Sequence, residues 1–398
     1  MEIRPIKPAE RIQLSKIQGI AFLFTQDFSE YEQNPEKFEK GYETGRAAFD
    51  DSGKMCSGLE LIPYHVRFDG NTVPMGGIGG VASLPEERKK RYIRKVFEYC
   101  TEEMYEKGVV FSYLYPFSHE YYRKFGYELN LTGIECAVPF SSLSHFRQTG
   151  DVRMFVPGME TSDIISVYRQ FIQDKNLSVV REQKHWERFF GKDPFKTNIF
   201  LYVWYDGEGV AKGYFQYSVE RNEKNRQEQN MKIHEFIWLN GEAFAGMLAF
   251  LNGFYPQFRN LFLRLPHFAD ILSFFPEPYK VEQHIRTQGM NRVVNVRKAL
   301  QLMKAPSGSG EAVIEVEDPF FPRNSGRYLV VWEDGKSGVA ESDREPDMIC
   351  SVNDLSQLIT GFATVSQLHT AGRIEAKRGF DRLDKLFAKK KLFLNDHF

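Results

Sequence analysis

The spacing of apolar and polar residues over the first third of the chain predicts a β-hairpin, a helix and a further strand. Residues 55–68 and 73–83 alternate in the manner of strands, and Asp69-Gly70-Asn71 between them is a hairpin turn signal. Residues 93–104 then carry apolar side chains three and four positions apart, which predicts a helix. An apolar run over 109–117 predicts the strand that follows.

The same part of the chain supplies further elements. Helices are expected at 8–23 and 118–125, and a strand is expected after Phe125-Gly126-Tyr127. The resulting order, helix, hairpin, helix and strand, is typical of a mixed sheet with helices on its faces. This first unit is expected to run to about residue 145.

Residues 150–285 repeat this order in a degenerate form, with a helix, a hairpin, a strand, a helix and a strand. The expected segments are 161–175, 200–205, 210–219, 232–239, 242–252 and 260–265. A third unit from residue 290 combines strands at 311–317 and 326–333 with helices at 352–360 and 381–388. The pattern therefore predicts an α+β protein with two mixed-sheet domains and a smaller C-terminal α/β domain.

A cluster of basic residues stands where the helix after the first hairpin begins. A helix N-terminus carries a partial positive charge and unpaired N–H groups, so it disfavours cations. The cluster becomes favourable when a phosphate or pyrophosphate joins it, and the alternative is a solvated basic helix face. The equivalent helix of the second unit begins at Asn240-Gly241-Glu242 and has no such cluster, so we expect no anion site there. The cluster consists of Arg88, Lys89, Lys90, Arg91 and Arg94.

Composition limits the possible functions. The 398 residues are 42% hydrophobic and 26% charged with a net charge of −1, which argues against nucleic acid or an anionic membrane as a partner. The four cysteines include no Cys-x-x-Cys pair, which favours buried thiols in a cytoplasmic protein over disulfides or a metal site. We expect no secretory signal and no membrane span.

The segment 81–94 resembles the acetyl-CoA motif of the GCN5-related N-acetyltransferase (GNAT) superfamily, in which a strand, a turn and a helix start hold the pantetheine arm and the pyrophosphate. Arg91 stands where that motif usually has its first glycine. The resemblance implies acetyl-CoA as cosubstrate, with the pantetheine arm on the strand and the pyrophosphate at the turn. The implied cofactor-binding residues are Val81, Ala82, Ser83, Arg88, Lys89, Arg91, Tyr92 and Ile93.

The segment from His119 to Tyr127 resembles the element Tyr-x-x-Phe-Gly-Tyr of the same superfamily, in which a tyrosine faces the thioester sulfur. Tyr122 matches that tyrosine. A phenol with a pKa of about 10 is protonated at neutral pH and can donate its proton to a leaving thiolate. Tyr121 and His119 are the rival candidates, and a packing role is the alternative for Tyr122.

The order of the three units is similar to that of the enhanced intracellular survival (Eis) type of acetyltransferase, which ends in a sterol carrier protein-like domain. The resemblance implies a catalytic domain over 1–148, a degenerate copy over 149–288 and a C-terminal domain over 289–398. It also implies that the α-carboxylate of Phe398 is the general base, with a frayed chain end as the alternative. Asp27 and its neighbour Phe28 match the amine pocket, although Asp27 could equally be an ordinary helix cap or loop carboxylate.

These resemblances imply an N-acetyltransferase that acts on primary amines of aminoglycoside, polyamine or lysine type without a metal. They also imply a homo-oligomer, a hexamer in this family. The alternatives are a non-catalytic protein that binds CoA or an acyl ligand, and a lipid-binding protein in which the third unit is a true carrier.

Overall fold

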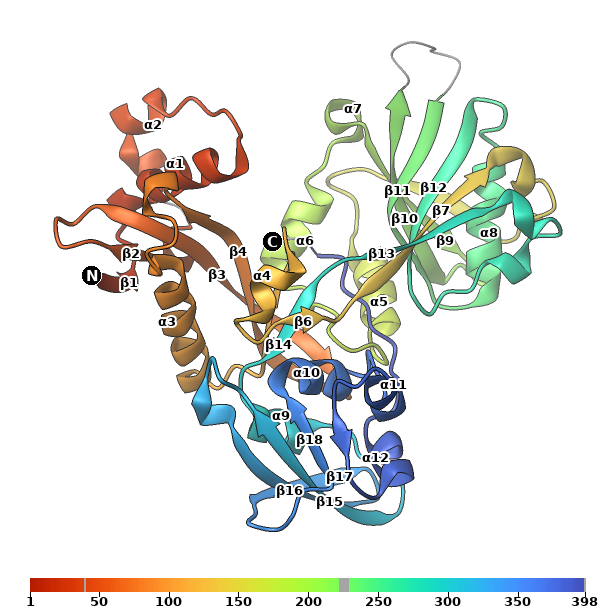
Figure 1. Cartoon of the computed structure of the whole chain (residues 1–398). Helices are drawn as coiled ribbons and strands as arrows, with labels where there is room; N and C mark the ends of the chain where they lie inside the picture. The colour runs from red at the N-terminus through yellow and green to blue at the C-terminus, as the bar shows by residue number, and fades with distance from the viewer. Residues whose placement is uncertain (39–40, 222–228, 397–398) are drawn as a thin grey trace. The chain divides into compact units, whose positions relative to one another are not determined.

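The computed structural model describes residues 1–38, 41–221 and 229–396 (Figure 1). The chain forms two compact units. The first combines Met1–Asn130 with Gly289–Lys390 and Asp396, and the second combines Leu131–Gln288 with Lys391–Asn395. Three sheets with flanking helices confirm the predicted α+β class. The predicted domain boundaries at residues 148 and 288 stay predictions. The two compact units each combine separate segments of the chain, so they do not test boundaries along the sequence.

A seven-stranded mixed sheet forms the N-terminal part of the first unit, in the order β1-β2-β3-β4-β5-β14-β6. The short strand β14 runs antiparallel to both of its neighbours, so a segment far along the chain completes this sheet. The strands are β1 (Glu2–Pro5), β2 (Gly45–Phe49), β3 (Met55–Phe68), β4 (Asn71–Ser83), β5 (Phe111–Leu114), β6 (Glu128–Leu129) and β14 (Met290–Val293).

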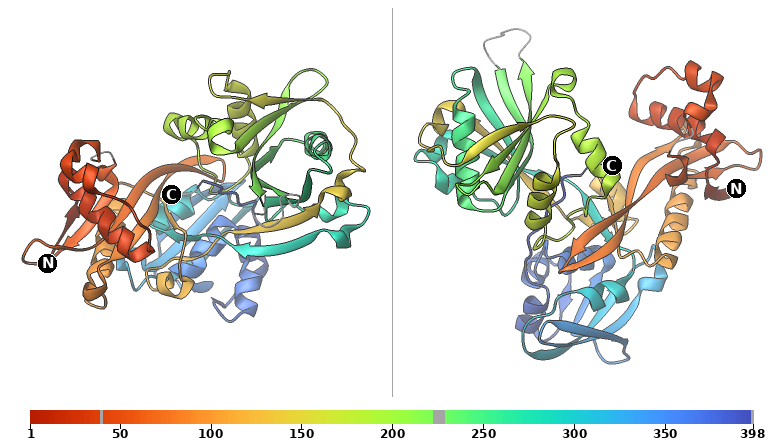
Figure 2. Two further views of the ribbon diagram at one scale, coloured as in Figure 1. Left: turned by 90° about the horizontal axis from the view of Figure 1, so that it is seen from above. Right: turned by 180° about the vertical axis from the view of Figure 1, so that it is seen from behind.

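Helices cover both faces of this sheet (Figures 1 and 2). Successive strand residues point to opposite sides, and here both sides present apolar side chains that the helices bury. On β2, Ala47 and Phe49 pack in the cluster that contains residues of α1, whereas Ala48 packs with α3. The apolar face predicted for residues 93–104 is buried as α3 against the sheet. The helices here are α1 (Arg11–Phe22), α2 (Ser29–Gln33), α3 (Tyr92–Glu106) and α4 (His119–Arg123).

The second unit repeats the order of the first, as the sequence predicted. Its sheet has the order β13-β7-β12-β11-β10-β9-β8. The strands are β7 (Thr132–Pro139), β8 (Asp151–Phe155), β9 (Ile199–Tyr205), β10 (Ala211–Arg221), β11 (Gln229–Trp238), β12 (Phe258–Pro266) and β13 (Glu282–Thr287). The helices are α5 (Ser162–Phe171), α6 (Gln183–Phe190), α7 (Pro194–Thr197) and α8 (Gly241–Asn252).

The strand expected after Tyr127 is divided between the two units. Residues 128–129 form β6 in the first sheet, whereas residues 132–139 form β7 in the second. The division falls at Asn130, whose backbone N–H bonds to Gly289 and whose side-chain amide donates to the Ser356 carbonyl at 2.8 Å. These hydrogen bonds hold Asn130 outside either ladder, a tertiary constraint that the apolar pattern does not contain.

A five-stranded sheet in the order β17-β16-β15-β18-β19 completes the first unit. Its strands are β15 (Ser309–Glu317), β16 (Gly326–Glu333), β17 (Lys336–Glu341), β18 (Met348–Ser351) and β19 (Glu375–Ala376). The helices are α9 (Val296–Leu302), α10 (Val352–Thr360), α11 (Val365–Thr370) and α12 (Phe380–Leu386). All four cysteines of the chain are buried and free, which confirms the prediction of thiols.

An ion pair between β2 and α3 predicts how acid destabilises the first unit. Arg46 donates two hydrogen bonds of 2.7 Å to the Glu103 carboxylate, and this pairing lowers the pKa of Glu103 to about 2 from its ordinary 4.5. A carboxylate with a lowered pKa contributes full stability above pH 4.5 and loses it as the pH falls towards 2.

We therefore expect Glu103→Gln to lower the free energy of unfolding at pH 7 by about 1–2 kcal/mol, a value reduced for partial exposure of the pair. The variant is also expected to lose less stability than the wild type between pH 5 and pH 3. Urea unfolding at both pH values measures the difference. Equal acid sensitivity of the two proteins would contradict this role of Glu103.

Candidate functional site

An opening in the first sheet lies where the acetyl-CoA arm is expected. Strand β4 pairs with its parallel neighbour β5 only from Met75 to Ile78, although β4 continues to Ser83. At the point of separation the register of β4 against β3 shifts, and Gly80 has a φ of +56°. A Cβ on Gly80 would lie 2.1 Å from Nε2 of Gln18, so this bulge requires glycine. The splayed part of β4 exposes backbone groups that β5 does not use.

The three strand residues predicted to hold the pantetheine arm lie in this splayed part of β4. Val81 is half-buried on the α3 side, and Ala82 is buried on the α1 side. The hydroxyl of Ser83 forms a 2.7 Å hydrogen bond with that of Ser57. The side chains of Ala82 and Ser83 are thus engaged within the protein, which leaves the backbone of β4 as the surface for a ligand.

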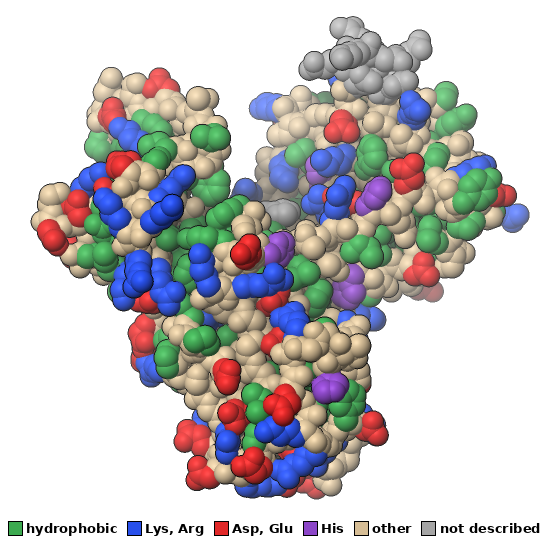
Figure 3. Space-filling view, in the orientation of Figure 1, with side chains coloured by type: hydrophobic (Ala, Val, Ile, Leu, Met, Phe, Trp, Pro, Cys, Tyr) green, Lys and Arg blue, Asp and Glu red, His purple; other side chains and the backbone are tan. Residues whose placement is uncertain are grey.

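The basic turn before α3 has the backbone that a phosphate site needs. Lys89 and Arg91 both have a φ of +67°, so Arg91 adopts the left-handed conformation that a glycine would favour. Among the described residues, Arg88, Lys89 and Arg91 form no ion pair and are exposed, whereas Lys90 pairs with Glu87 at 2.9 Å. Lys and Arg side chains gather over α3 in Figure 3. The uncompensated charges and the bulged strand fit a CoA ligand.

The left-handed conformation of Arg91 predicts a difference between two substitutions that remove the same charge. A side chain with a Cβ costs about 1–2 kcal/mol in this region, and glycine does not. We therefore expect Arg91→Gly to have a free energy of unfolding about 1 kcal/mol above that of Arg91→Ala. Both variants are expected to bind CoA more weakly than the wild type, by calorimetric titration. An alanine variant as stable as the glycine variant would contradict the strain at residue 91.

Tyr122 lies in α4, shortly after β5, in a pocket of aromatic rings. It is 3% exposed, and its ring centroid lies 6.1 Å from that of Phe97 and 5.4 Å from that of Phe117. Burial raises the pKa of the Tyr122 phenol well above its ordinary value, with smaller contributions from Tyr121 and Tyr127. The phenol therefore stays protonated at neutral pH and keeps a proton to donate.

The two rivals of Tyr122 have different surroundings. Tyr121 is half-buried and carries the Nζ of Lys124 over its ring at 4.0 Å. Burial, together with the charge of Arg123, lowers the pKa of His119, so its imidazole is neutral at pH 7. The Nε2 atom of His119 is buried and has no hydrogen-bond partner among the described residues. Both groups lie on α4 with Tyr122.

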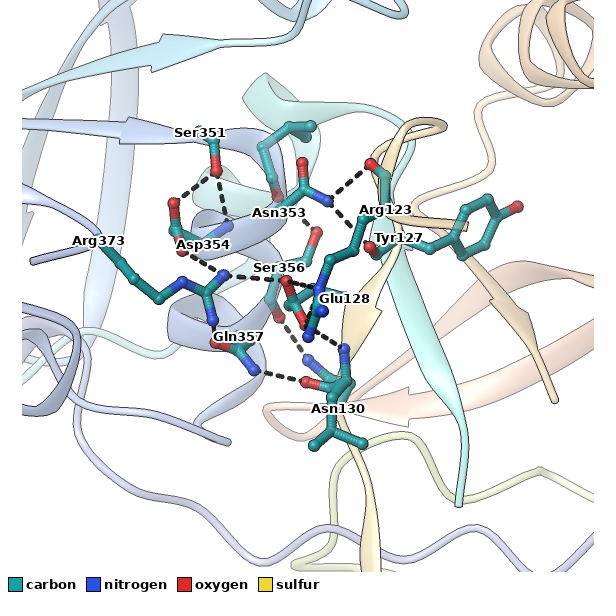
Figure 4. Close-up of polar contacts among 12 residues, drawn as sticks. Arg123, Tyr127, Glu128, Asn130, Ser351, Asn353, Asp354, Ser356, Gln357 and Arg373 are labelled. Carbon is teal, nitrogen blue, oxygen red and sulfur yellow. Dashed lines mark hydrogen bonds and ion pairs between the residues drawn. The ribbon is translucent and has the colours of Figure 1, made fainter. Parts of the chain in front are cut away.

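The C-terminal part of the first unit holds the Phe-Gly-Tyr element in place. Asn353 of α10 donates hydrogen bonds of 3.0 and 2.9 Å to the carbonyls of Arg123 and Tyr127 (Figure 4). From β14, Arg292 donates to the carbonyl of Phe125 and pairs with Asp318 at 2.5 Å. The backbone on either side of Gly126 is thus fixed by side chains that are distant in sequence.

Sequence reasoning did not find Asn353, Arg292 or Asp318. Asn353 follows the cap of a predicted helix, and its partners are backbone carbonyls of another sheet. Arg292 lies in a four-residue strand that shows no alternation. The sequence does contain one signal for this pair. Arg292 and Asp318 each stand next to apolar residues, and a charged side chain in a buried segment usually has a partner of opposite charge.

The predicted base lies at the end of the chain. Phe398 is outside the described residues, and Asp396 is the last residue described. The hydroxyl of Tyr115 donates a 2.8 Å hydrogen bond to the carbonyl of Asp396. Tyr115 directly follows β5, so the chain two residues before Phe398 is attached at the end of this strand.

Asp27 lies in the loop between α1 and α2 and is exposed. Its carboxylate accepts hydrogen bonds from the hydroxyl and, at 2.8 Å, from the backbone N–H of Ser29, and these bonds lower the pKa of Asp27. The N-cap of α2 is Phe28, so Asp27 is a loop carboxylate that bonds locally to Ser29, and a role towards an amine stays a prediction. The half-buried Phe28 beside it faces Phe38 edge-on at 6.2 Å.

In the parts of the chain that the structure describes, no cluster of three or more His, Cys, Asp or Glu residues is suited to a metal ion. None of the helices described has the length and apolar content needed to cross a bilayer.

Solved structures match the whole chain, and family models match three segments of it. Models of the GNAT acetyltransferase domain match residues 2–130 and 177–297, and a sterol carrier protein domain matches residues 296–395. No curated protein matches the sequence.

Three similar structures share the fold over their full length. A GCN5-related N-acetyltransferase from Anabaena variabilis is 22% identical with a TM-score of 0.87, and each chain is covered completely. A probable N-acyltransferase from Enterococcus faecalis is also 22% identical, with a TM-score of 0.87 and coverage of 100% and 99%. Eis1 from Mycobacterium abscessus is 18% identical with a TM-score of 0.83 and complete coverage of both chains. The chain therefore belongs to the GCN5-related N-acetyltransferases, with a C-terminal sterol carrier protein domain and a fold like that of Eis1.

Proposed function

We propose that this enzyme transfers the acetyl group of acetyl-CoA to a primary amine of aminoglycoside, polyamine or lysine type, with Tyr122 as general acid and the Phe398 carboxylate as general base. The observation that supports the proposal is that Tyr122 and Asp396, two residues before Phe398, both lie in or contact the segment after β5. The ring of Tyr122 lies 5.4 Å from that of Phe117, which belongs to the segment that follows this strand. In the same segment, the hydroxyl of Tyr115 donates a 2.8 Å hydrogen bond to the carbonyl of Asp396. The proposal therefore assigns the acid and the base to groups near the end of β5.

The residues of the chain divide the work of the reaction. Acetyl-CoA supplies the acetyl group as a thioester, and the β4 backbone with the basic turn would hold its arm and phosphates. An alkylamine has a pKa of about 10.4, so it must lose a proton before it can attack. The Phe398 carboxylate accepts that proton directly or through water, and Tyr122 donates its proton to the sulfur that leaves. Alignment of the two substrates supplies much of the remaining acceleration.

The segment between α1 and α2 is proposed to receive the acceptor. Asp27 offers a carboxylate to an ammonium group, and Phe28 offers an aromatic surface. The adjacent end of α1 exposes apolar side chains, since Phe22 is 53% and Leu23 is 90% exposed. An acceptor that carries both positive charge and an apolar surface fits this chemistry.

The proposal is tested by thiol release from acetyl-CoA with an aminoglycoside, a polyamine and a lysine-bearing peptide, and with a neutral polyol as control. We expect release above hydrolysis with at least one amine and none with the polyol. CoA binding without turnover on any amine would refute the proposed reaction and favour the non-catalytic alternative.

We infer a homohexamer, as the Eis type implies. We infer a cytoplasmic location from the buried free thiols and the lack of a Cys-x-x-Cys pair. Light scattering on the purified protein tests the number of subunits.

A further inference from the structure

The second sheet keeps an opening equivalent to that of the first. Strand β11 pairs with its parallel neighbour β12 only as far as Lys232 and Phe262, although β11 continues to Trp238 and β12 to Pro266. The register of β11 against β10 shifts between Ile233 and Glu235, at the point of separation. In the first sheet the shift of β4 against β3 has the same place, just beyond the last pair with β5.

The phosphate half of a CoA site is missing beside this second opening. Helix α8 begins at Gly241, and the side chain of Asn240 already accepts the N–H of Ala243 at 2.8 Å. Glu242 in the first turn adds a negative charge where a phosphate would need a positive one. This confirms the expectation of a helix start without a basic cluster, and it leaves only the arm-binding half of the groove.

The remaining half of the groove contains a segment of the chain itself. Residues 392–395 line the same small cavity as Glu235 of β11 and Leu265 of β12. Leu392, Phe393 and Leu394 are 0%, 8% and 4% exposed. The Asn395 amide donates to the His234 carbonyl at 3.2 Å, at the bulge where β11 leaves β12. The side-chain amide of Asn395 thus bonds to the strand edge that corresponds to the predicted pantetheine edge of β4.

A buried ion pair supports the last residue of this segment. The same Asn395 amide donates to a carboxylate oxygen of Glu235 at 2.9 Å. Glu235 is 4% exposed and accepts two hydrogen bonds from Arg181, at 2.9 and 2.6 Å, and one from Tyr214 at 2.6 Å. Arg181 in turn lies 4.1 Å from the centroid of the Tyr168 ring. The carboxylate that Asn395 contacts is therefore held in place by three other hydrogen bonds.

We propose that the degenerate second domain has become the receptor for the chain's own segment 392–395, with Asn395, Glu235 and Arg181 as positioning residues for the chain end. This inference rests on the proposed role of the Phe398 carboxylate as base. Three residues span at most about 10 Å, so the anchor at Asn395 limits where that carboxylate can go. Docking of segment 392–395 would thereby limit how far the Phe398 carboxylate can reach.

Limited trypsin digestion tests the docking without any activity. Cleavage after Lys391, whose side chain is 53% exposed, releases residues 392–398. We expect slow release from the wild type and at least tenfold faster release from Asn395→Ala. Asn395→Asp places a second carboxylate at Glu235 and should release the segment faster still. The double variant Asn395→Asp with Glu235→Gln restores an amide–carboxylate pair in reversed order and should recover most of the protection.

Steady-state kinetics distinguishes a positioning role of Asn395 from a general loss of structure. With an amine acceptor, Asn395→Ala is expected to lower kcat about tenfold with an unchanged KM for acetyl-CoA, and the double variant should recover part of the loss. Asn230→Ala, on the paired part of β11, is the matched control and should change neither readout.

Each outcome decides one part of the proposal. Unchanged release from Asn395→Ala would overturn the docking, and faster release with an unchanged kcat would overturn the positioning role. A wild type that protects the segment but acetylates no amine would refute the proposed function, and the positioning role with it, while supporting the docking.

Discussion

Replacing Tyr122 with phenylalanine is expected to lower the turnover number for acetyl transfer by about 10²–10³-fold while leaving the affinity for CoA nearly unchanged. The substitution removes one hydroxyl and keeps the ring, so the aromatic contacts with Phe97 and Phe117 persist. Because burial raises the pKa of this phenol, its proton is present at neutral pH. Without that proton the sulfur must leave as a thiolate in apolar surroundings, which is unfavourable.

The controls for Tyr122 lie on the same short helix. Tyr121→Phe removes a hydroxyl from the half-buried neighbour and is expected to change the turnover number by less than about threefold. His119→Ala should act in the same modest way. Steady-state kinetics with calorimetric CoA binding measures all three variants. A large loss in Tyr121→Phe with normal turnover in Tyr122→Phe would assign the acid to Tyr121.

Replacing Asp318 with alanine is expected to lower the free energy of unfolding by about 3–5 kcal/mol. The side chains of Arg292 and Asp318 are both fully buried and lie 2.5 Å apart. Asp318 also accepts hydrogen bonds from the Asn324 amide and from the backbone N–H of Phe321, each at 3.0 Å. Its loss leaves a buried guanidinium without its counter-charge, which costs far more than the pair contributes as a whole.

An exposed pair provides the comparison for Asp318. Arg297 pairs with Glu341 at 2.5 Å, but the two side chains are 40% and 84% exposed. Glu341→Gln is therefore expected to change the unfolding free energy by less than about 0.5 kcal/mol. Replacing both buried partners, as Arg292→Met with Asp318→Leu, should recover much of the lost stability. Denaturant unfolding measures these differences in the free energy of unfolding. A small effect of Asp318→Ala would show that the buried guanidinium of Arg292 finds another partner.

The strands and helices of the catalytic half could largely be predicted because their signals are local. The alternation over 55–83 and the helical spacing over 93–104 gave β3, β4 and α3 within a few residues. The turn signal at Asp69-Gly70 is borne out by positive φ values at both residues. Each of these features depends on neighbours in the sequence, which is the information that periodicity contains.

The parts that could not be predicted depend on distant contacts. Strand β14 has four buried residues with Asn291 and Arg292 among them, so neither period appears. The conformation of Arg91 follows from the fold around it, because arginine alone does not favour a positive φ. The catalytic assignments stay predictions, since Phe398 is outside the described residues and Tyr122 shows only the environment that an acid requires.

The position of β14 between β5 and β6 has a consequence for synthesis on the ribosome (Figure 1). The catalytic sheet cannot close until Met290–Val293 has been translated, after the whole of residues 131–288. At about 5–20 residues per second, the nascent first sheet waits on the order of 10–30 s with a gap beside β5. Unpaired strand edges of this kind invite wrong pairing, so the nascent chain is expected to depend on chaperones during that interval.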